Sequence, residues 1–337
     1  MTIPDASRLK PLLSHIPYSP PAWASRMTPP QNGRIVLTHA PTPVFAWRCP
    51  ALAELHVDWS IKRDDLSGLE LSGNKARKLE FLLAEAVGAA HDCVLTIGGL
   101  QSNHCRATAA AARLIGLDPH LVLLSGKVDQ DPGETAQQLR REGLNPYVIP
   151  VGASNALGTW GYVDAIEELR QQFDLDHGGE LPFEHLVITT GSAGSAAGLA
   201  IGAHLAQLGV SVHAVCVNGS VDEKYEEIGL IGEKMRCWEK GEGSKMAREI
   251  IRIYDGVGRG YGASQKDELE FAAKVGMASG ILLDPIYTGK GMYYFCQAVQ
   301  QRPENFRNSR VLWWHTGGMF SMWAMQRDLL PLLPRGQ

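Results

Sequence analysis

One lysine stands where the sequence gives it no simple structural role. Lys75 closely follows Gly73, which frees the backbone, and begins a segment whose apolar residues recur at the spacing of one helix face. These apolar residues are Leu79, Leu82, Leu83 and Ala86. Lys75 extends the same face, where a charged ammonium loses hydration. The sequence leaves two alternatives: a side chain that reaches solvent from the helix start, or an amine used in chemistry.

Polar side chains also gather where a short apolar run gives way to a helical pattern. Ser102, Asn103 and His104 follow the pair Gly98-Gly99. Ser102 and Asn103 are of the types that cap helices, and capping alone explains either of them. A hydroxyl beside an amide and an imidazole also suits substrate binding. His104 on its own is of a type more often packed or exposed than catalytic.

A second such loop is rich in glycine and hydroxyl groups. It consists of Thr190, Gly191, Ser192, Ala193, Gly194 and Ser195. Free N–H groups and hydroxyls at a helix N-terminus bind anions, and the helix dipole assists. Neither the lysine of a P-loop nor the G-x-G-x-x-G spacing of dinucleotide-binding proteins is present. The loop predicts a phosphate site, and a tight turn between strand and helix explains its glycines equally well.

Further polar groups lie in C-terminal loops. Tyr261 is bracketed by glycines, Tyr287 and Thr288 precede a helical pattern, and Thr316 follows an apolar run. Packing explains either tyrosine, and the threonine hydroxyls are neutral hydrogen-bonding groups. Together with Lys75 and the phosphate loop, these neutral groups predict pyridoxal phosphate held as a Schiff base.

The elements that must position these residues alternate along the chain. Short apolar runs and helical patterns follow one another from Arg34 onward, which predicts an α/β fold with parallel sheets. The expected strands are 59–62, 93–97, 120–124, 147–149, 185–189, 210–217 and 311–314. The expected helices are 75–90, 104–115, 134–141, 155–173, 195–208, 266–278 and 290–300. In such sheets ligands bind beyond the carboxyl ends of strands, where these loops fall.

Composition excludes several classes of protein. A net charge of −4 without a long basic run argues against nucleic acid as a partner, and no apolar run is long enough to span a membrane. Six scattered cysteines without a C-x-x-C pair predict reduced thiols in a cytoplasmic protein, with neither disulfides nor a metal site. The first thirty-odd residues are rich in proline and poor in acids. They predict a loosely packed N-terminal arm and leave organelle targeting open.

Separated motifs resemble the family of D-cysteine desulfhydrases and 1-aminocyclopropane-1-carboxylate deaminases. They are K-R-D-D-L-S-G-L-E-L-S-G-N-K-A-R-K-L at 62–79, I-G-G-L-Q-S-N-H-C-R-A-T at 97–108, P-V-G-A-S-N-A-L-G-T-W-G-Y at 150–162, L-D-P-I-Y-T-G-K-G-M at 283–292 and H-T-G-G at 315–318. The resemblance runs from about 41 to 328 and implies the tryptophan-synthase-β-like fold, called fold type II among pyridoxal phosphate enzymes. It implies an arm over 1–34, a large cofactor-binding domain over 35–90 and 160–337, and a small domain over 91–159.

The resemblance also implies roles for the residues named above. Lys75 would hold the cofactor and then move the Cα proton, Ser102 would grip the substrate carboxylate or assist at the substrate, and Asn103 would bond the 3-hydroxyl of the cofactor. Tyr261 and Tyr287 would flank the ring and the substrate. The loop from Thr190 to Ser195 would bind the phosphate, and the protein would be a homodimer.

Thr288 distinguishes the two branches of this family. The deaminase branch resembles Tyr-Glu-Gly-Lys at this motif, where a carboxylate keeps the pyridine nitrogen protonated. This chain has a neutral threonine, whether Thr288 or Thr316 faces the nitrogen, and so a weaker electron sink. Losing a thiolate demands less of the cofactor than opening a cyclopropane. We therefore expect β-elimination of D-cysteine to pyruvate, hydrogen sulfide and ammonia. The alternatives are cyclopropane deamination and D-serine dehydration.

One segment departs from the family pattern. Only one helix-length stretch lies between the expected strands 120–124 and 147–149, so the small domain is shortened near 131–146 by about one βα unit. A shortened sheet exposes unpaired edges. The sequence therefore also leaves open a weakly active or inactive variant that only binds cofactor.

Overall fold

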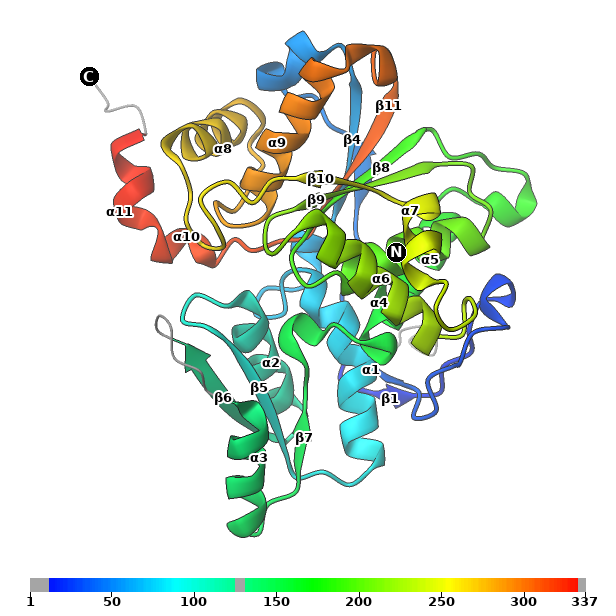
Figure 1. The fold of residues 1–337 in the computed structure, drawn as a ribbon, viewed down its shortest axis with the longest axis vertical. Helices are drawn as coiled ribbons and strands as arrows, with labels where there is room; N and C mark the ends of the chain where they lie inside the picture. The colour runs from blue at the N-terminus through cyan, green and yellow to red at the C-terminus, as the bar shows by residue number, and fades with distance from the viewer. Residues whose placement is uncertain (1–11, 125–130, 333–337) are drawn as a thin grey trace, which may run out of the picture.

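The computed structural model describes residues 12–124 and 131–332 and contains two sheets flanked by helices, together with a two-stranded sheet near the N-terminus (Figure 1). The larger sheet has, in spatial order, β10 (Arg252–Asp255), β9 (Ser211–Cys216), β8 (His185–Thr190), β11 (Arg310–His315), β4 (Asp58–Arg63) and β3 (Val44–Ala46). The smaller sheet has the order β6 (Asp118–Leu124), β5 (Cys93–Gly99) and β7 (Pro146–Val148). The predicted α/β fold with two open sheets is confirmed.

Nearly all strand pairs are parallel, as the alternation of strands and helices predicts. Within the larger sheet the exception is the edge strand β3, which runs antiparallel to β4 and was not among the expected strands. The carboxyl ends of β4, β8, β9 and β11 therefore lie along one edge of the larger sheet. The loops that follow these strands meet there, facing the smaller sheet.

Helices cover both faces of the larger sheet. The helices on one face are α4 (Ala156–Gln172), α5 (Gly194–Leu205), α6 (Val221–Lys234) and α7 (Gly243–Ile250). Those on the other face are α8 (Lys266–Ser279) and α9 (Thr288–Gln301). Alternate residues of a strand point to opposite faces, so β8 gives Leu186 and Ile188 to one core and Val187 to the other. Two short helices, α10 (Ser321–Ala324) and α11 (Gln326–Leu329), follow β11.

The smaller sheet is covered in the same way. Its flanking helices are α1 (Asn74–Gly88), α2 (Asn103–Leu114) and α3 (Pro132–Arg141). The first two pack with Val94 of β5, and α3 packs with Leu95 and Ile97 on the opposite face. The expected helices from 75, 104 and 134 therefore form, with starts within two residues of the prediction.

The shortened region falls at the edges of the smaller sheet. Only α3 lies between β6 and β7 among the described residues, and both strands pair with β5 alone. The central strand β5 keeps a partner on each side and carries the loop with Ser102 and Asn103 at its carboxyl end. The loop with Ser102 and Asn103 therefore follows the one strand of this sheet that is hydrogen-bonded on both sides, in spite of the shortening. The domain borders remain a prediction.

The N-terminal arm is packed, so the expectation of a loose arm is wrong for residues 12–34. Strand β1 (His15–Ile16) pairs antiparallel with β2 (Arg34–Ile35). Ala24 and Met27 are buried in the core beside α4, α5 and α6. The ring of Tyr18 meets Phe81 of α1 edge-on at 4.9 Å between centroids. The sequence did not predict this packing, because the apolar residues of the arm stand between prolines and do not recur at helix or strand spacing.

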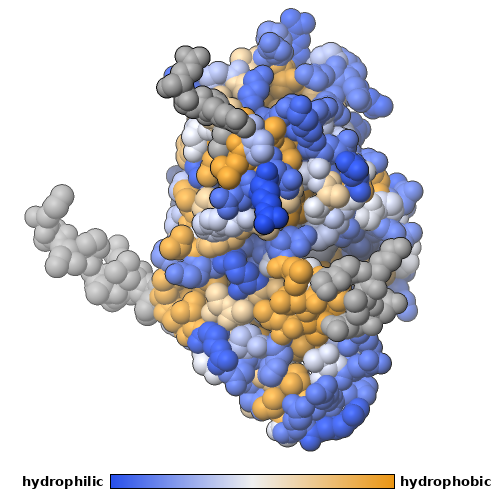
Figure 2. Space-filling model, turned by 90° about the vertical axis from the view of Figure 1, so that its left-hand side faces the viewer, coloured by the Kyte–Doolittle hydropathy of each residue, from blue (hydrophilic) through white to orange (hydrophobic). Residues whose placement is uncertain are grey.

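No helix in the described part of the chain is both long enough and apolar enough to cross a bilayer. Figure 2 shows hydrophilic residues over most of the face that it presents, with apolar residues gathered in the lower middle. All six cysteines are free thiols.

Candidate active site

A cavity of about 240 Å³ lies between the two sheets, at the carboxyl ends of their strands. Nearly all of the residues expected at the site line it. These are Lys75, Ser102, Asn103, Thr190, Gly191, Ser192, Ala193, Ser195, Tyr261, Tyr287 and Thr316. His104, Asn74 and Asn218 line it as well. Two expected residues, Gly194 and Thr288, are not among the lining residues.

Lys75 enters the cavity from the first turn of α1. Gly73 caps this helix with φ +101°, and a Cβ there would lie 2.8 Å from the carbonyl oxygen of Thr316, so only glycine fits. The Lys75 Nζ atom lies 3.7 Å from the point that a Cβ on Gly152 would occupy. Burial lowers the pKa of Lys75 to about 8. The Lys75 side chain thus ends within the cavity and does not reach solvent, and its ammonium loses the proton more readily than in water.

A buried polar network fixes the helix that carries Lys75. Arg77 donates to Asp64 of the segment after β4 and to Glu168 of α4, at 2.8 and 2.9 Å. Tyr162 and Trp314 also donate to Asp64, each at 2.8 Å. Burial opposes the charge of Asp64, but the Arg77 guanidinium prevails and lowers the pKa of this carboxyl to about 2. Fully satisfied buried networks of this kind give one rigid arrangement.

The glycine-rich loop stands at the N-terminus of α5. Ala193 has φ +55°, an uncommon conformation for a residue with a side chain, which turns the chain into the helix. Ser154, in the segment between β7 and α4, holds the loop in place. Its hydroxyl donates to the Ser192 carbonyl and accepts from the Gly194 N–H at 2.8 Å. Gly194 thus serves the loop through its backbone while lying behind the cavity wall.

Lys78 lies behind this loop with no partner for its charge. Its side chain is fully buried, and its Nζ atom makes no hydrogen bond to any described residue. Burial lowers the pKa of Lys78 well below its usual range, and the nearby Lys75 lowers it further. A Cβ on Gly194 would stand 3.1 Å from the Lys78 Nζ. A buried amine without a partner, beside free N–H groups, takes up a proton most readily when an anion binds next to it, so this is a site for an anion.

The opposite wall carries the loop from β5 to α2. The Ser102 hydroxyl caps α2 by accepting from the Cys105 N–H at 3.2 Å, so capping and a place in the cavity coincide. His104 is buried and bonds the Thr96 hydroxyl at 2.8 Å. Burial and the nearby lysines lower the pKa of His104 well below its usual range, so the imidazole is neutral.

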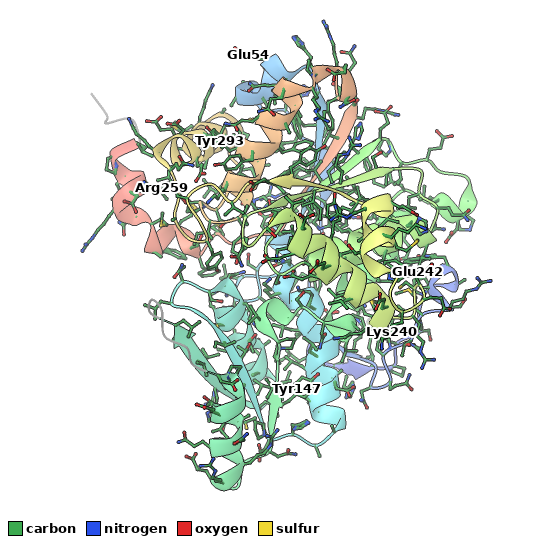
Figure 3. All side chains as sticks on the ribbon, in the orientation of Figure 1. Glu54, Tyr147, Lys240, Glu242, Arg259 and Tyr293 are labelled. Atoms are coloured by element: carbon green, nitrogen blue, oxygen red, sulfur yellow. The ribbon has the colours of Figure 1, made fainter. Side chains whose placement is uncertain are left out.

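Two tyrosines close the cavity from the larger sheet. The Tyr287 hydroxyl donates to the Tyr261 hydroxyl at 2.9 Å, so Tyr261 keeps its own proton free to donate. Burial raises the pKa of both phenols. In Figure 3, the labelled Arg259 marks the loop of Tyr261 on the larger sheet's side, and Tyr147 marks β7 in the smaller sheet.

The structure corrects the placement of Thr288. This residue is fully buried outside the cavity, where its hydroxyl donates to Asp284 at 2.7 Å. The same carboxylate accepts from the N–H groups of Tyr287 and Thr288 at the start of α9. Thr288 therefore helps Asp284 to hold the helix start, and Thr316 is the threonine that lines the cavity.

A family model described as pyridoxal-phosphate dependent enzyme matches residues 121–317, more than half of the chain. The chain belongs to the pyridoxal-phosphate dependent enzymes. It adopts their α/β fold with parallel sheets, as expected for fold type II.

Named relatives agree with this membership. The Arabidopsis thaliana protein named bifunctional D-cysteine desulfhydrase/1-aminocyclopropane-1-carboxylate deaminase, mitochondrial, is 37% identical over 95% of this chain and 87% of its own length. The Klebsiella pneumoniae D-cysteine desulfhydrase is 33% identical over 88% of this chain and 97% of its own. The Arabidopsis alignment spans 356 positions, more than the 337 residues of this chain, so the relative has residues that this chain lacks.

Solved structures support the fold. One described as an ACC deaminase homologue superposes with a TM-score of 0.74 and 30% identity, over 89% of this chain and 96% of its own. A Rhizomucor miehei L-serine ammonia-lyase superposes with a TM-score of 0.60 at 17% identity, which speaks for the fold alone.

The residues present fit pyridoxal phosphate. Lys75 offers an amine with a lowered pKa to the aldehyde. The phosphate would bind the N-terminus of α5, where the orphaned Lys78 ammonium supplies a counter-charge. The sequence interpretation missed Lys78 and the network of Arg77 and Asp64. Their only signal was one more lysine on the helix face of Lys75, an arginine between the two lysines, and an acidic pair after β4.

Proposed function

We propose that this chain catalyses the β-elimination of D-cysteine to pyruvate, hydrogen sulfide and ammonia. Relatives named D-cysteine desulfhydrase support the substrate, and the cavity supports the reaction. The observation that carries the choice is the neutral lining of the cavity: among the described residues that line it there is no aspartate or glutamate.

A neutral lining favours a good leaving group. Bound pyridoxal phosphate supplies an electron sink for negative charge at the substrate Cα. A carboxylate in the cavity would keep the ring nitrogen protonated and strengthen that sink, but Thr316 offers only a hydroxyl. Release of a thiolate places less demand on the sink than opening of an unactivated cyclopropane ring. D-cysteine therefore suits this site better than the cyclopropane amino acid.

Residues from both walls of the cavity take part in the proposed reaction. Lys75, as the amine, takes the proton from the substrate Cα. The Cβ–S bond then breaks, the sulfur leaves with the bonding electron pair, and Tyr261 protonates it; the Tyr287 hydroxyl bonded to Tyr261 at the cavity supports this role. Ser102, at the N-terminus of α2, binds the substrate carboxylate with help from the helix dipole. The resulting 2-aminoacrylate reacts with water to give pyruvate and ammonia.

Release of sulfide from D-cysteine by the purified protein tests the proposal. D-cysteine and L-cysteine are compared with and without added pyridoxal phosphate, and Lys75→Ala serves as the inactive variant. We expect sulfide and pyruvate in equal amounts from D-cysteine only, and none from Lys75→Ala. A cofactor-loaded protein that releases no sulfide from D-cysteine would overturn the proposal.

Cyclopropane deamination is the second candidate. The Thermotoga maritima relative named putative 1-aminocyclopropane-1-carboxylate deaminase is 34% identical over 88% of this chain and all of its own. The test measures 2-oxobutanoate formed from 1-aminocyclopropane-1-carboxylate under the same conditions, with D-serine as a further substrate. We expect D-cysteine to give the highest kcat/KM of the three.

We also propose that the protein is a cytoplasmic homodimer. The free state of its cysteines supports a reducing compartment, and the dimer rests on the family resemblance. Sedimentation equilibrium of the purified protein tests the dimer, and a fluorescent fusion tests the location. A monomer at micromolar concentration, or a fusion that gathers in an organelle, would contradict the respective part.

A further inference from the structure

Arg106 makes an unusual set of contacts one turn into α2. Its Nε and Nη2 atoms donate to the Asn103 Oδ1 atom at 3.0 and 2.7 Å. Its Nη1 atom donates to the Glu70 carbonyl, and Nη2 also reaches the Ser72 carbonyl at 3.3 Å. The guanidinium lies over the Phe320 ring at 4.1 Å from its centroid. Arg106 thus joins α2, the loop before Lys75 and the segment after β11.

These contacts decide which end of the Asn103 amide faces the cavity. A guanidinium has only donors, so the amide must turn its oxygen towards Arg106. The planar fork holds this oxygen with two hydrogen bonds, which a lysine could not do. The remaining polar atom, Nδ2, makes no hydrogen bond to any described residue, and it lies 3.4 Å from where a Cβ on Gly73 would stand. Asn103 can therefore offer the cavity donors only.

We propose that Arg106 is a positioning residue that fixes Asn103 as a hydrogen-bond donor to the 3-oxygen of pyridoxal phosphate. The inference rests on the proposed contact of Asn103 with the cofactor, and it does not depend on which amino acid is the substrate. When the Asn103 amide donates to the phenolate 3-oxygen, the negative charge of that oxygen is stabilised. The oxygen then attracts the proton on the nitrogen between Lys75 and the cofactor less strongly. That proton therefore leaves at a lower pH.

Loss of Arg106 frees the amide to rotate. A flipped amide presents Oδ1 to the phenolate and repels it, so the oxygen holds the shared proton more strongly. Arg106→Met, which keeps the length of the side chain but not its donors, should then raise the pKa of the visible absorbance band of the bound cofactor. Since a hydrogen bond to a charged oxygen is lost, the expected rise is about one pH unit or more.

The experiment is a pH titration of that band in the cofactor-loaded protein without substrate. The variants are Asn103→Ala, Arg106→Met and the double variant, with Arg113→Met as the matched control, because Arg113 is exposed on the same helix. The other titratable groups at the cavity are Lys75, Lys78, His104, Tyr261 and Tyr287, and all variants retain them. Differences in pKa between variants therefore report on Asn103 and Arg106.

A positioning role predicts a specific pattern. Asn103→Ala and Arg106→Met each raise the pKa, the double variant rises no further than the larger single effect, and Arg113→Met leaves the pKa unchanged. If Asn103→Ala shifts the pKa and Arg106→Met does not, the inference about Arg106 is wrong. If Asn103→Ala has no effect, the contact of Asn103 with the cofactor is wrong. Additive shifts would mean that Arg106 acts by its charge alone and would also overturn the inference.

If Arg106→Met does not fold, a second variant at the same position, Arg106→Lys, still tests the inference. Arg106→Lys keeps the charge near Phe320 but offers a single ammonium where the fork made two bonds. We expect a pKa between those of the wild type and Asn103→Ala. A wild-type pKa in folded Arg106→Lys would show that charge suffices and that the fork does not orient the amide.

Discussion

The Nζ atom of Lys78 lies 3.1 Å from the point at which a Cβ on Gly194 would stand. The lysine comes from α1, one turn after Lys75, and the glycine begins α5 at the far side of the cavity wall. One helix therefore supplies both the amine for the cofactor and the cation behind its phosphate loop. The Lys78 Nζ atom has no hydrogen-bond partner among the described residues, so it is free to bind the phosphate.

Lys78→Met should act in opposite directions on the cofactor-free and the cofactor-loaded protein. The substitution replaces a buried amine that has no hydrogen-bond partner among the described residues, so the free energy of unfolding of the cofactor-free protein should rise by on the order of 1 kcal/mol. The affinity for pyridoxal phosphate should fall by about tenfold or more, because a charged hydrogen bond to the phosphate is lost. Denaturant titration and equilibrium dialysis measure the two effects. Lys274→Met, at an exposed site on α8, should change neither.

Lys75 should bind the cofactor with a pH dependence set by its own pKa of about 8. Below this pH the side chain is an ammonium without a free electron pair, and above it the amine can attack the aldehyde. The rate at which cofactor-free protein binds pyridoxal phosphate should therefore rise with pH to a plateau, with a midpoint near pH 8. Stopped-flow absorbance measures this rate. A rate that is still climbing towards pH 10 would contradict the lowered pKa.

The same shift affects stability in a predictable direction. The folded protein loses the Lys75 proton near pH 8 and the unfolded chain near the ordinary lysine pKa of 10.5, so the unfolded state binds more protons between these two values. Stability should rise with pH across this window, relative to Lys75→Met, because burial of the ammonium opposes folding. Parallel denaturant titrations of both cofactor-free proteins check the difference.

Replacement of the two threonines should separate their roles. Thr288→Glu places a second carboxylate against the buried Asp284, so we expect a loss of stability of about 2 kcal/mol or more and no new activity. Thr316→Asp places a carboxylate within the cavity. It should raise the ratio of cyclopropane deamination to D-cysteine elimination by about tenfold through a stronger sink. Equal ratios in wild type and Thr316→Asp would refute the argument from the neutral lining.

We expect the two tyrosines to act together, with Tyr287 donating to Tyr261 and Tyr261 protonating the leaving sulfur. Tyr261→Phe removes the terminal donor and should lower kcat by about 100-fold, as expected for lost general acid catalysis. Tyr287→Phe should cost less, and the double variant should resemble Tyr261→Phe because the two hydroxyls act in series. Since the pKa of both phenols is raised, neither substitution should move the alkaline limb of the kcat/KM profile. Multiplying losses in the double variant would mean that the hydroxyls act independently.

Two helices that the sequence did not predict were missed for one physical reason. Helices α6 and α7 contain glycines at their contact, where a Cβ on Gly229 would lie 2.3 Å from the Gly243 backbone. Glycine lowers helix propensity, so a local pattern indicates a break where tertiary packing requires a close approach. The placement of Thr288 has a similar cause. The motif shows that the Thr288 hydroxyl lies at a helix start. It does not show that this hydroxyl bonds Asp284 and therefore points away from the cavity.

The sequence by itself determined the α/β alternation, the loops that carry the site and the unusual position of Lys75. These follow from periodicity and residue type, which are local properties of the chain. Tertiary structure alone decided that Lys75 is an amine of lowered pKa, that Lys78 is unpaired and that Arg106 turns the Asn103 amide. Burial, the pairing of charges and amide orientation depend on atoms from distant segments, so no local pattern contains them.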